Sequence, residues 1–155
     1  TDEIYTAFLG EPCSGRTFYH GHTYTGNPLA CAAAMASLRL IEEDRVLDNV
    51  ARIALCLEQQ WMHRTHELAP AQLLVRHKGA MLGVELRRGD DTPFAPELRV
   101  GHQVVLECRR RGVIVRNIGD VIVLMPAPAM PVELVERLCE VVQESIAAVL
   151  PRLAT

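Results

Sequence analysis

Two stretches of the chain have the pattern of β-hairpins, and they constrain the fold more than any other feature. The run "LLVRHKGAMLGVELR", which begins at Leu73, has β-branched and apolar residues broken by Gly79, as two antiparallel strands with a tight turn would. The run "VIVRNIGDVIVLMPAP" predicts a second hairpin, with strands over 113–116 and 121–125 and a turn over 117–120. The sequence therefore predicts a small, mostly antiparallel sheet.

Helical patterns surround both hairpins. Asn27-Pro28 is a strong helix start, because asparagine caps free amides and proline is preset for the first helical position. The helix that follows is apolar nearly all round, so we expect it to pack closely on several sides. The chain is thus expected to be an α+β domain whose sheet is covered on one face by helices. After a short helix or turn over 1–9, helices are predicted over 28–43, 46–68, 96–111 and 132–150.

Composition excludes several classes of protein. The chain has 155 residues, the size of one domain, and its net charge of -3 gives no electrostatic case for a nucleic-acid or anionic-membrane partner. No apolar run reaches the roughly 18 residues of a membrane span, and the N-terminal residues lack the pattern of a signal peptide. The five cysteines are odd in number and form no CxxC pair, so neither a disulfide framework nor a zinc site is predicted. Free thiols indicate a cytoplasmic protein.

The polar loop "GHTYTGN" directly precedes the predicted helix start. Its glycines, hydroxyl groups and helix N-terminus suit an anion such as phosphate, although a loop that only caps the helix is the simpler interpretation. His20 and His22 would point the same way in a strand, as metal ligands sometimes do. Since no carboxylate or thiol lies at ligand spacing, we expect no metal site.

Arg116 is the second candidate, because it ends a predicted strand just before a turn. A guanidinium there can hold a carboxylate by two parallel hydrogen bonds, and the alternative is a surface arginine on a hairpin. Lys78 is the only lysine of the chain, and its place in a turn makes it a poor candidate for a buried amine nucleophile.

Three runs of the sequence carry a resemblance to a known family. "YHGHTYTGNPLACAAAMASL", "GAMLGVELR" and "RRRGVIVRNIGDVIVLMPAP" closely resemble the C-terminal third of the class III, pyridoxal-phosphate-dependent aminotransferases. The resemblance covers essentially the whole chain and implies part of a fold-type I transferase. Residues 1–44 would be the remnant of the large, cofactor-binding domain with a linking helix, and residues 45–155 would be the small C-terminal α+β domain.

The resemblance also implies roles for individual residues. Thr23 matches the family threonine that donates a hydrogen bond to the phosphate of pyridoxal 5'-phosphate held by the other subunit of a homodimer with shared active sites. Gly21 and His22 match positions near the substrate and the phosphate respectively, and the backbone of His22 is the expected contact. Arg116 matches the arginine that receives the substrate carboxylate in the members that act in biotin biosynthesis.

Those members transfer an amino group from S-adenosylmethionine, or in some cases lysine, to 8-amino-7-oxononanoate. The family lysine that binds the cofactor covalently has no match in this chain, and Lys78 does not take its place. "TDEIYTAFLG" resembles the segment just after that lysine, so we expect a C-terminal fragment that cannot transaminate alone. Two alternatives stay open: another class III enzyme that acts on ω-amino acids or diamines, and a non-enzymatic module that binds a small ligand or a protein.

Overall fold

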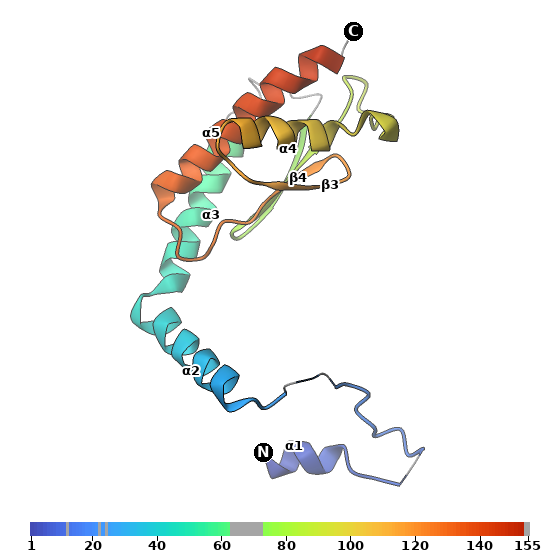
Figure 1. Cartoon of the computed structure of the whole chain (residues 1–155), viewed down its shortest axis with the longest axis vertical. Coiled ribbons are helices and arrows are strands. Elements are labelled where there is room, and N and C mark those ends of the chain that lie inside the picture. Colours follow the sequence, from blue (N-terminus) through green and yellow to red (C-terminus); the bar gives the residue numbers. More distant parts are fainter. Residues whose placement is uncertain (12, 22, 24, 63–72, 154–155) are drawn as a thin grey trace. The chain divides into compact units, whose positions relative to one another are not determined.

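The computed structural model divides the chain into two compact units, Thr1–Arg39 and Leu40–Thr155 (Figure 1). The domain boundary predicted from the sequence, at residue 44, stays a prediction. The residues that the structure describes are 1–11, 13–21, 23, 25–62 and 73–153.

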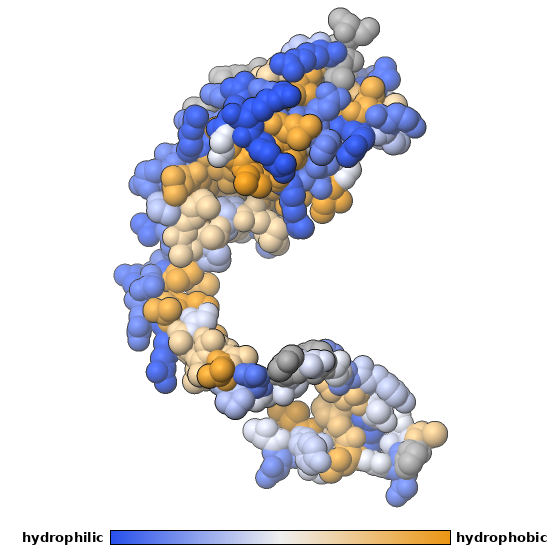
Figure 2. Space-filling view, viewed as in Figure 1, coloured by the Kyte–Doolittle hydropathy of each residue, from blue (hydrophilic) through white to orange (hydrophobic). Residues whose placement is uncertain are grey.

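The first unit contains helix α1, Asp2–Ala7, and most of helix α2, Pro28–Glu43. The predicted extent of α2 is confirmed, but its expected close packing is wrong for this structure, because none of its residues is buried. An apolar helix can be buried, but burial also requires another segment that packs against it. Figure 2 shows apolar side chains along this helix at the surface, and the large ones are Leu29, Met35, Leu38, Leu40 and Ile41.

The second unit is built on one antiparallel sheet. Its strand order is β1-β2-β4-β3, so each hairpin contributes two neighbouring strands and β2 pairs with β4 in the middle. Both predicted hairpins are therefore confirmed, as is the α+β class. The strands are β1 Leu73–Lys78, β2 Met81–Leu86, β3 Arg116–Ile118 and β4 Val121–Leu124.

Helices cover one face of this sheet (Figure 1). They are α3, Val46–Met62, α4, Val100–Arg110, and α5, Val132–Val149. Alternate residues of the central strands point into the shared core, as strand geometry requires. The buried strand residues are Leu82, Val84 and Leu86 of β2 and Ile122 and Leu124 of β4. Trp61 of α3 and Ile146 of α5 are also fully buried in this core.

Two predicted boundaries need correction, and a third stays a prediction. The second hairpin is tighter than expected, since β3 begins at Arg116 and the turn is only Gly119 and Asp120. The helix predicted over 96–111 is broken at Arg99, which has a left-handed φ of 47° and separates a 3-10 turn over Pro96–Leu98 from α4. The part of the predicted third helix beyond residue 62 lies outside the described residues.

The break in that helix lets α4 start against the second hairpin. The Gly101 amide donates a 2.8 Å hydrogen bond to Asp120 Oδ1, which lies in the β3-β4 turn. This contact comes from residues 19 positions apart, so the local helical pattern of the sequence could not reveal it. It ties α4 to the turn that follows Arg116.

Candidate functional site

The loop before α2 carries the residues that the sequence associates with phosphate. Gly21 and Thr23 are both exposed, whereas His22 lies outside the described residues. No described residue forms a hydrogen bond with the Thr23 hydroxyl, so this group is available to an incoming acceptor. A Cβ atom built on Gly21 meets nothing within 4 Å, so the chain leaves open space beside this backbone.

The helix cap changes which groups of this loop can meet an anion. Asn27 Oδ1 accepts hydrogen bonds from the amides of Leu29, at 2.9 Å, and Ala30, at 3.1 Å. Pro28, at the first position of the helix, has no N–H. The first-turn amides of Leu29 and Ala30 are therefore already bound by the cap, so the Thr23 hydroxyl stays a candidate donor to an anion at this loop.

Arg116 is the first residue of β3, which is an edge strand of the sheet. It is exposed, and its side chain forms no ion pair or hydrogen bond with any described residue. It lines two hollows of the second unit, of about 610 Å³ and about 420 Å³. Gly21 and Thr23 belong to the first unit, so the structure describes them separately from Arg116.

The larger hollow is mostly apolar. It lies between the segment before β3, the segment after β4 and the start of α5. Arg137 also lines it, but its guanidinium is 3.5 Å from Glu140, so Arg116 is the cation of this hollow that has no acidic partner among the described residues. Apolar walls with one available cation suit an aliphatic carboxylate. The apolar lining includes Ile114, Val115, Met125, Leu134 and Leu138.

The smaller hollow lies on the face of the sheet that the helices leave open. The strand register places Arg76, Gly83, Val123 and Arg116 in one row across this face, one residue from each strand. Lys78 follows two residues after Arg76 and lines the same hollow as Arg116. Sequence reasoning missed this grouping, although the alternation of Arg76 and Lys78 in β1 was a signal for it.

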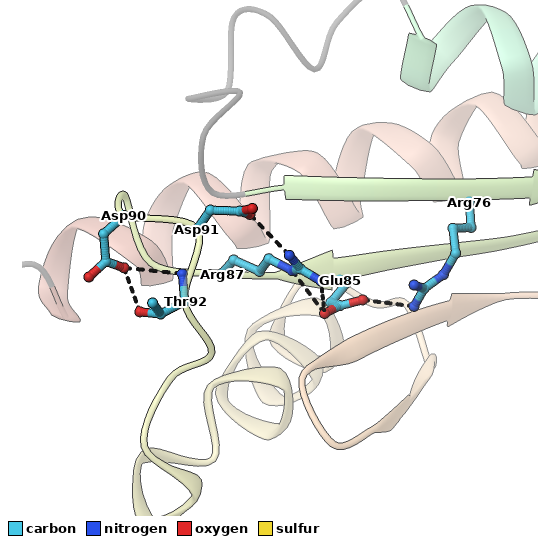
Figure 3. A network of polar contacts seen from close by, with 6 residues as sticks. All are labelled: Arg76, Glu85, Arg87, Asp90, Asp91 and Thr92. Atoms are coloured by element: carbon cyan, nitrogen blue, oxygen red, sulfur yellow. Dashed lines mark hydrogen bonds and ion pairs between the residues drawn. The ribbon is translucent and has the colours of Figure 1, made fainter.

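A network of charged side chains lies beside this open face (Figure 3). Glu85 Oε2 accepts a 2.8 Å bond from Arg76, and Glu85 Oε1 accepts a 2.9 Å bond from Arg87. Arg87 also donates to Asp91 at 3.1 Å. Its hydrogen bond to Asp91, and next its hydrogen bond to Glu85, raise the pKa of the Arg87 guanidinium. Arg76 is therefore engaged by a carboxylate, in contrast to Lys78 and Arg116.

The described part of the chain contains neither a cluster of metal ligands nor a helix suited to span a membrane. Within it, no three histidine, cysteine, aspartate or glutamate side chains gather as they would around a metal ion. None of its helices combines the length and the apolar character that crossing a membrane requires.

Comparison with known sequences points to one family. The profile described as "Aminotransferase class-III" matches residues 1–146. A relative from Nitratidesulfovibrio vulgaris, named adenosylmethionine-8-amino-7-oxononanoate aminotransferase, is 46% identical over a match of 156 aligned positions, which covers 96% of this chain and 28% of the relative. A relative of the same name from Geobacter sulfurreducens is 43% identical, over 94% of this chain and 32% of its own length. The chain thus spans about a third of the length of these relatives.

Comparison with solved structures agrees. The crystal structure of adenosylmethionine-8-amino-7-oxononanoate aminotransferase from Methanocaldococcus jannaschii has a TM-score of 0.76 and 33% identity, and the match covers 96% of this chain and 34% of that one. A transaminase from the marine bacterium Virgibacillus has a TM-score of 0.81 and 28% identity, over 98% and 34% of the two chains. These matches confirm the predicted fold type. The chain belongs to the class III, pyridoxal-phosphate-dependent aminotransferase family.

Proposed function

We propose that this chain is the C-terminal part of an aminotransferase of biotin biosynthesis. The complete enzyme transfers an amino group from S-adenosylmethionine to 8-amino-7-oxononanoate and forms 7,8-diaminononanoate. The observation that carries this proposal is Arg116, an exposed cation without an acidic partner among the described residues, at the wall of two hollows. The names of the relatives from Nitratidesulfovibrio and Geobacter supply the substrates.

Arg116 binds the carboxylate of the amino acceptor. Its planar guanidinium forms two parallel hydrogen bonds with a carboxylate, which fixes the direction of the chain as well as its end. The apolar side chains beside Arg116 would accompany the aliphatic part of such a molecule. Holding both in place orients the keto group for reaction, so loss of the arginine weakens binding more than it changes the chemistry.

Thr23 holds the phosphate of pyridoxal 5'-phosphate. The available hydroxyl of Thr23, next to the open space at Gly21, fits a phosphate oxygen as hydrogen-bond acceptor. When bound, the cofactor stores the amino group between the two half-reactions and serves as the electron sink for the substrate. His22 contributes its backbone amide to the same phosphate, and Gly21 leaves room for substrate.

The complete enzyme is a homodimer in which Thr23 reaches the cofactor of the partner subunit. The exposed apolar side chains of the first unit and of α2 support this arrangement, since apolar surface of this extent favours an interface. We place the protein in the cytoplasm, where the free thiols of its five cysteines stay reduced.

A chimeric enzyme tests this function. This chain replaces the matching C-terminal part of the Geobacter relative, to which it is 43% identical, and the purified chimera is loaded with pyridoxal 5'-phosphate. We expect amination of 8-amino-7-oxononanoate with S-adenosylmethionine as donor. Replacing Arg116 by Gln should raise KM for the acceptor about tenfold or more, since a charged hydrogen-bonded pair is lost. Replacing Thr23 by Val should weaken cofactor retention.

The same chimera distinguishes the alternatives. A relative from Caulobacter vibrioides named omega-aminotransferase is 34% identical over 95% of this chain, so ω-amino acids and diamines are assayed in parallel. Amination of those substrates without activity on 8-amino-7-oxononanoate would replace our assignment by theirs. A folded, cofactor-loaded chimera that aminates none of them would favour a binding module.

A further inference from the structure

The open face of the sheet has a shape and a charge pattern that Arg116 alone does not explain. Its hollow of about 420 Å³ runs over all four strands, from Arg76 and Lys78 at one edge to Arg116 and Ile118 at the other. Gly83 and Val123 lie between them, opposite each other in the β2-β4 register. Three strand spacings separate the two edges, a backbone distance of about 14 Å.

The floor of this hollow is mostly apolar. Met81, Val123 and Met125 supply apolar side chains, and Met81 and Met125 are 51% and 56% exposed, so their surface is available to a ligand. Gly83, in the middle of the sheet, adds no side chain to this floor. An unbranched aliphatic chain fits this floor, because methionine side chains adapt to such partners.

The charges at the rim are uniformly positive. None of the described residues that line the hollow is acidic. Arg76 is neutralised by its 2.8 Å bond to Glu85, as Figure 3 shows, whereas Lys78 and Arg116 form no ion pair or hydrogen bond with any described residue. Two long cationic side chains thus approach one apolar floor from opposite edges without a counter-charge in the described structure.

We propose that the open face is a binding site for a medium-chain carboxylate, in which Lys78 and Arg116 hold the carboxylate jointly and the floor at Gly83 and Val123 holds the aliphatic chain. This inference rests on the proposed function and deepens it, since the amino acceptor is such a carboxylate. Lys78 is then a specificity-determining residue of the acceptor site. Its flexible ammonium adds a point charge to the planar fork of the arginine.

Nonanoate binding to the 155-residue chain tests the inference. Binding is followed by nuclear magnetic resonance shifts of the chain at low ionic strength, in wild type and in four variants. We expect Lys78→Gln to weaken binding roughly threefold, as for one exposed ion pair, and Lys78→Arg to restore it. Arg116→Gln should weaken binding about tenfold. Arg109→Gln is the matched control and should change nothing, because Arg109 is exposed on α4 and does not line the hollow.

Two conditions sharpen the result. Added salt should reduce the difference between wild type and Lys78→Gln, since the interaction is with an exposed charge. Acetate carries the same carboxylate without the chain and should bind far more weakly than nonanoate, since each buried methylene strengthens binding by up to about fourfold.

The outcomes separate this inference from the proposed function. If Lys78→Gln binds nonanoate as wild type does while Arg116→Gln does not, the arginine acts alone, which overturns the joint site and leaves the proposed function standing. If Arg116→Gln has no effect on nonanoate binding or on KM in the chimera, the proposed carboxylate role of Arg116 fails as well. Absence of nonanoate binding, or binding that none of the variants alters, overturns the joint site, and KM in the chimera then decides the proposed function separately.

Discussion

Replacing Gly101 by Ala should destabilise the second unit, although alanine is the better helix former. Gly101 is the second residue of α4 and lies against the β3-β4 turn. A Cβ atom there would be 2.5 Å from the carbonyl oxygen of Gly119 and 3.0 Å from Cα of Asp120. Both neighbours are backbone atoms, which cannot rotate away, so the helix and the turn would have to separate.

The expected magnitude follows from three contributions. Overpacking of this kind costs about 1–3 kcal/mol. Separation also weakens the 2.8 Å bond from the Gly101 amide to the Asp120 carboxylate, and a hydrogen bond to a charged group contributes about 1.5–3 kcal/mol. The helix propensity of alanine returns about 1 kcal/mol. The net loss of unfolding free energy should be about 1–3 kcal/mol, which lowers Tm by roughly 3–10 °C.

Urea unfolding followed by far-ultraviolet circular dichroism measures this difference. Gly89→Ala is the matched control, because a Cβ atom on Gly89 meets nothing within 4 Å and its φ is not in the left-handed region. We expect the control to stay within about 0.5 kcal/mol of wild type, as surface substitutions usually do. A Gly101→Ala chain as stable as wild type, or more stable, would refute the close approach between α4 and the turn.

Three further predictions concern the core and its edges. The side-chain amide of Asn49 donates two 2.9 Å hydrogen bonds, to the carbonyl oxygens of Pro128 and Met130, and Asn49→Ala removes both. The unfolding free energy should fall by about 1–3 kcal/mol and lower the urea midpoint, and an unchanged midpoint would contradict this. A thiol reagent should label exposed Cys13 rapidly and buried Cys139 only after unfolding, and equal labelling rates would show that this burial is wrong. Burial raises the pKa of Cys139 from 9.0 to about 12, so between these pH values the folded state retains a proton that the unfolded state loses. The stabilising effect of this thiol should be complete below about pH 9, and the unfolding free energy should fall by up to about 1.4 kcal/mol per pH unit towards pH 12. Urea unfolding at pH 8 and pH 10.5 measures this fall, which should be smaller for Cys139→Ala.

Local patterns in the sequence were sufficient for most of the fold. The Asn27-Pro28 start predicted the first residue of α2, because capping depends on neighbouring residues only. Alternation and turn residues likewise predicted both hairpins. The helix over 96–111 was wrong at Arg99, where the left-handed backbone accompanies the start of α4 against a turn from the other hairpin. Such a contact between distant segments leaves no mark on a local pattern.

In the candidate site, too, the sequence identified individual residues, while their grouping came from the structure. Thr23 and Arg116 were identified by residue type, position and resemblance, and their roles stay predictions. Lys78 was set aside as a turn residue, because only the pairing of β1 with β2, and of β2 with β4, shows that it shares a face with Arg116. From the sequence, the first-turn amides of α2 were expected to be available to phosphate. The amides of Leu29 and Ala30 instead donate to Asn27 Oδ1, and this depends on the conformation of the Asn27 side chain.

The sequence by itself determined the family, through the resemblance of its motifs to known members. It also determined the α+β class, the two hairpins and the chemical character of each candidate residue, because these depend on periodicity, turn residues and residue type. The tertiary structure decided which residues meet: the strand order β1-β2-β4-β3, the contact of Gly101 with the second hairpin, and the charge pattern of the open face. The physical reason is that strand pairing and helix packing join residues far apart in the chain, and the free energy of those contacts depends on three-dimensional register, which no single segment encodes.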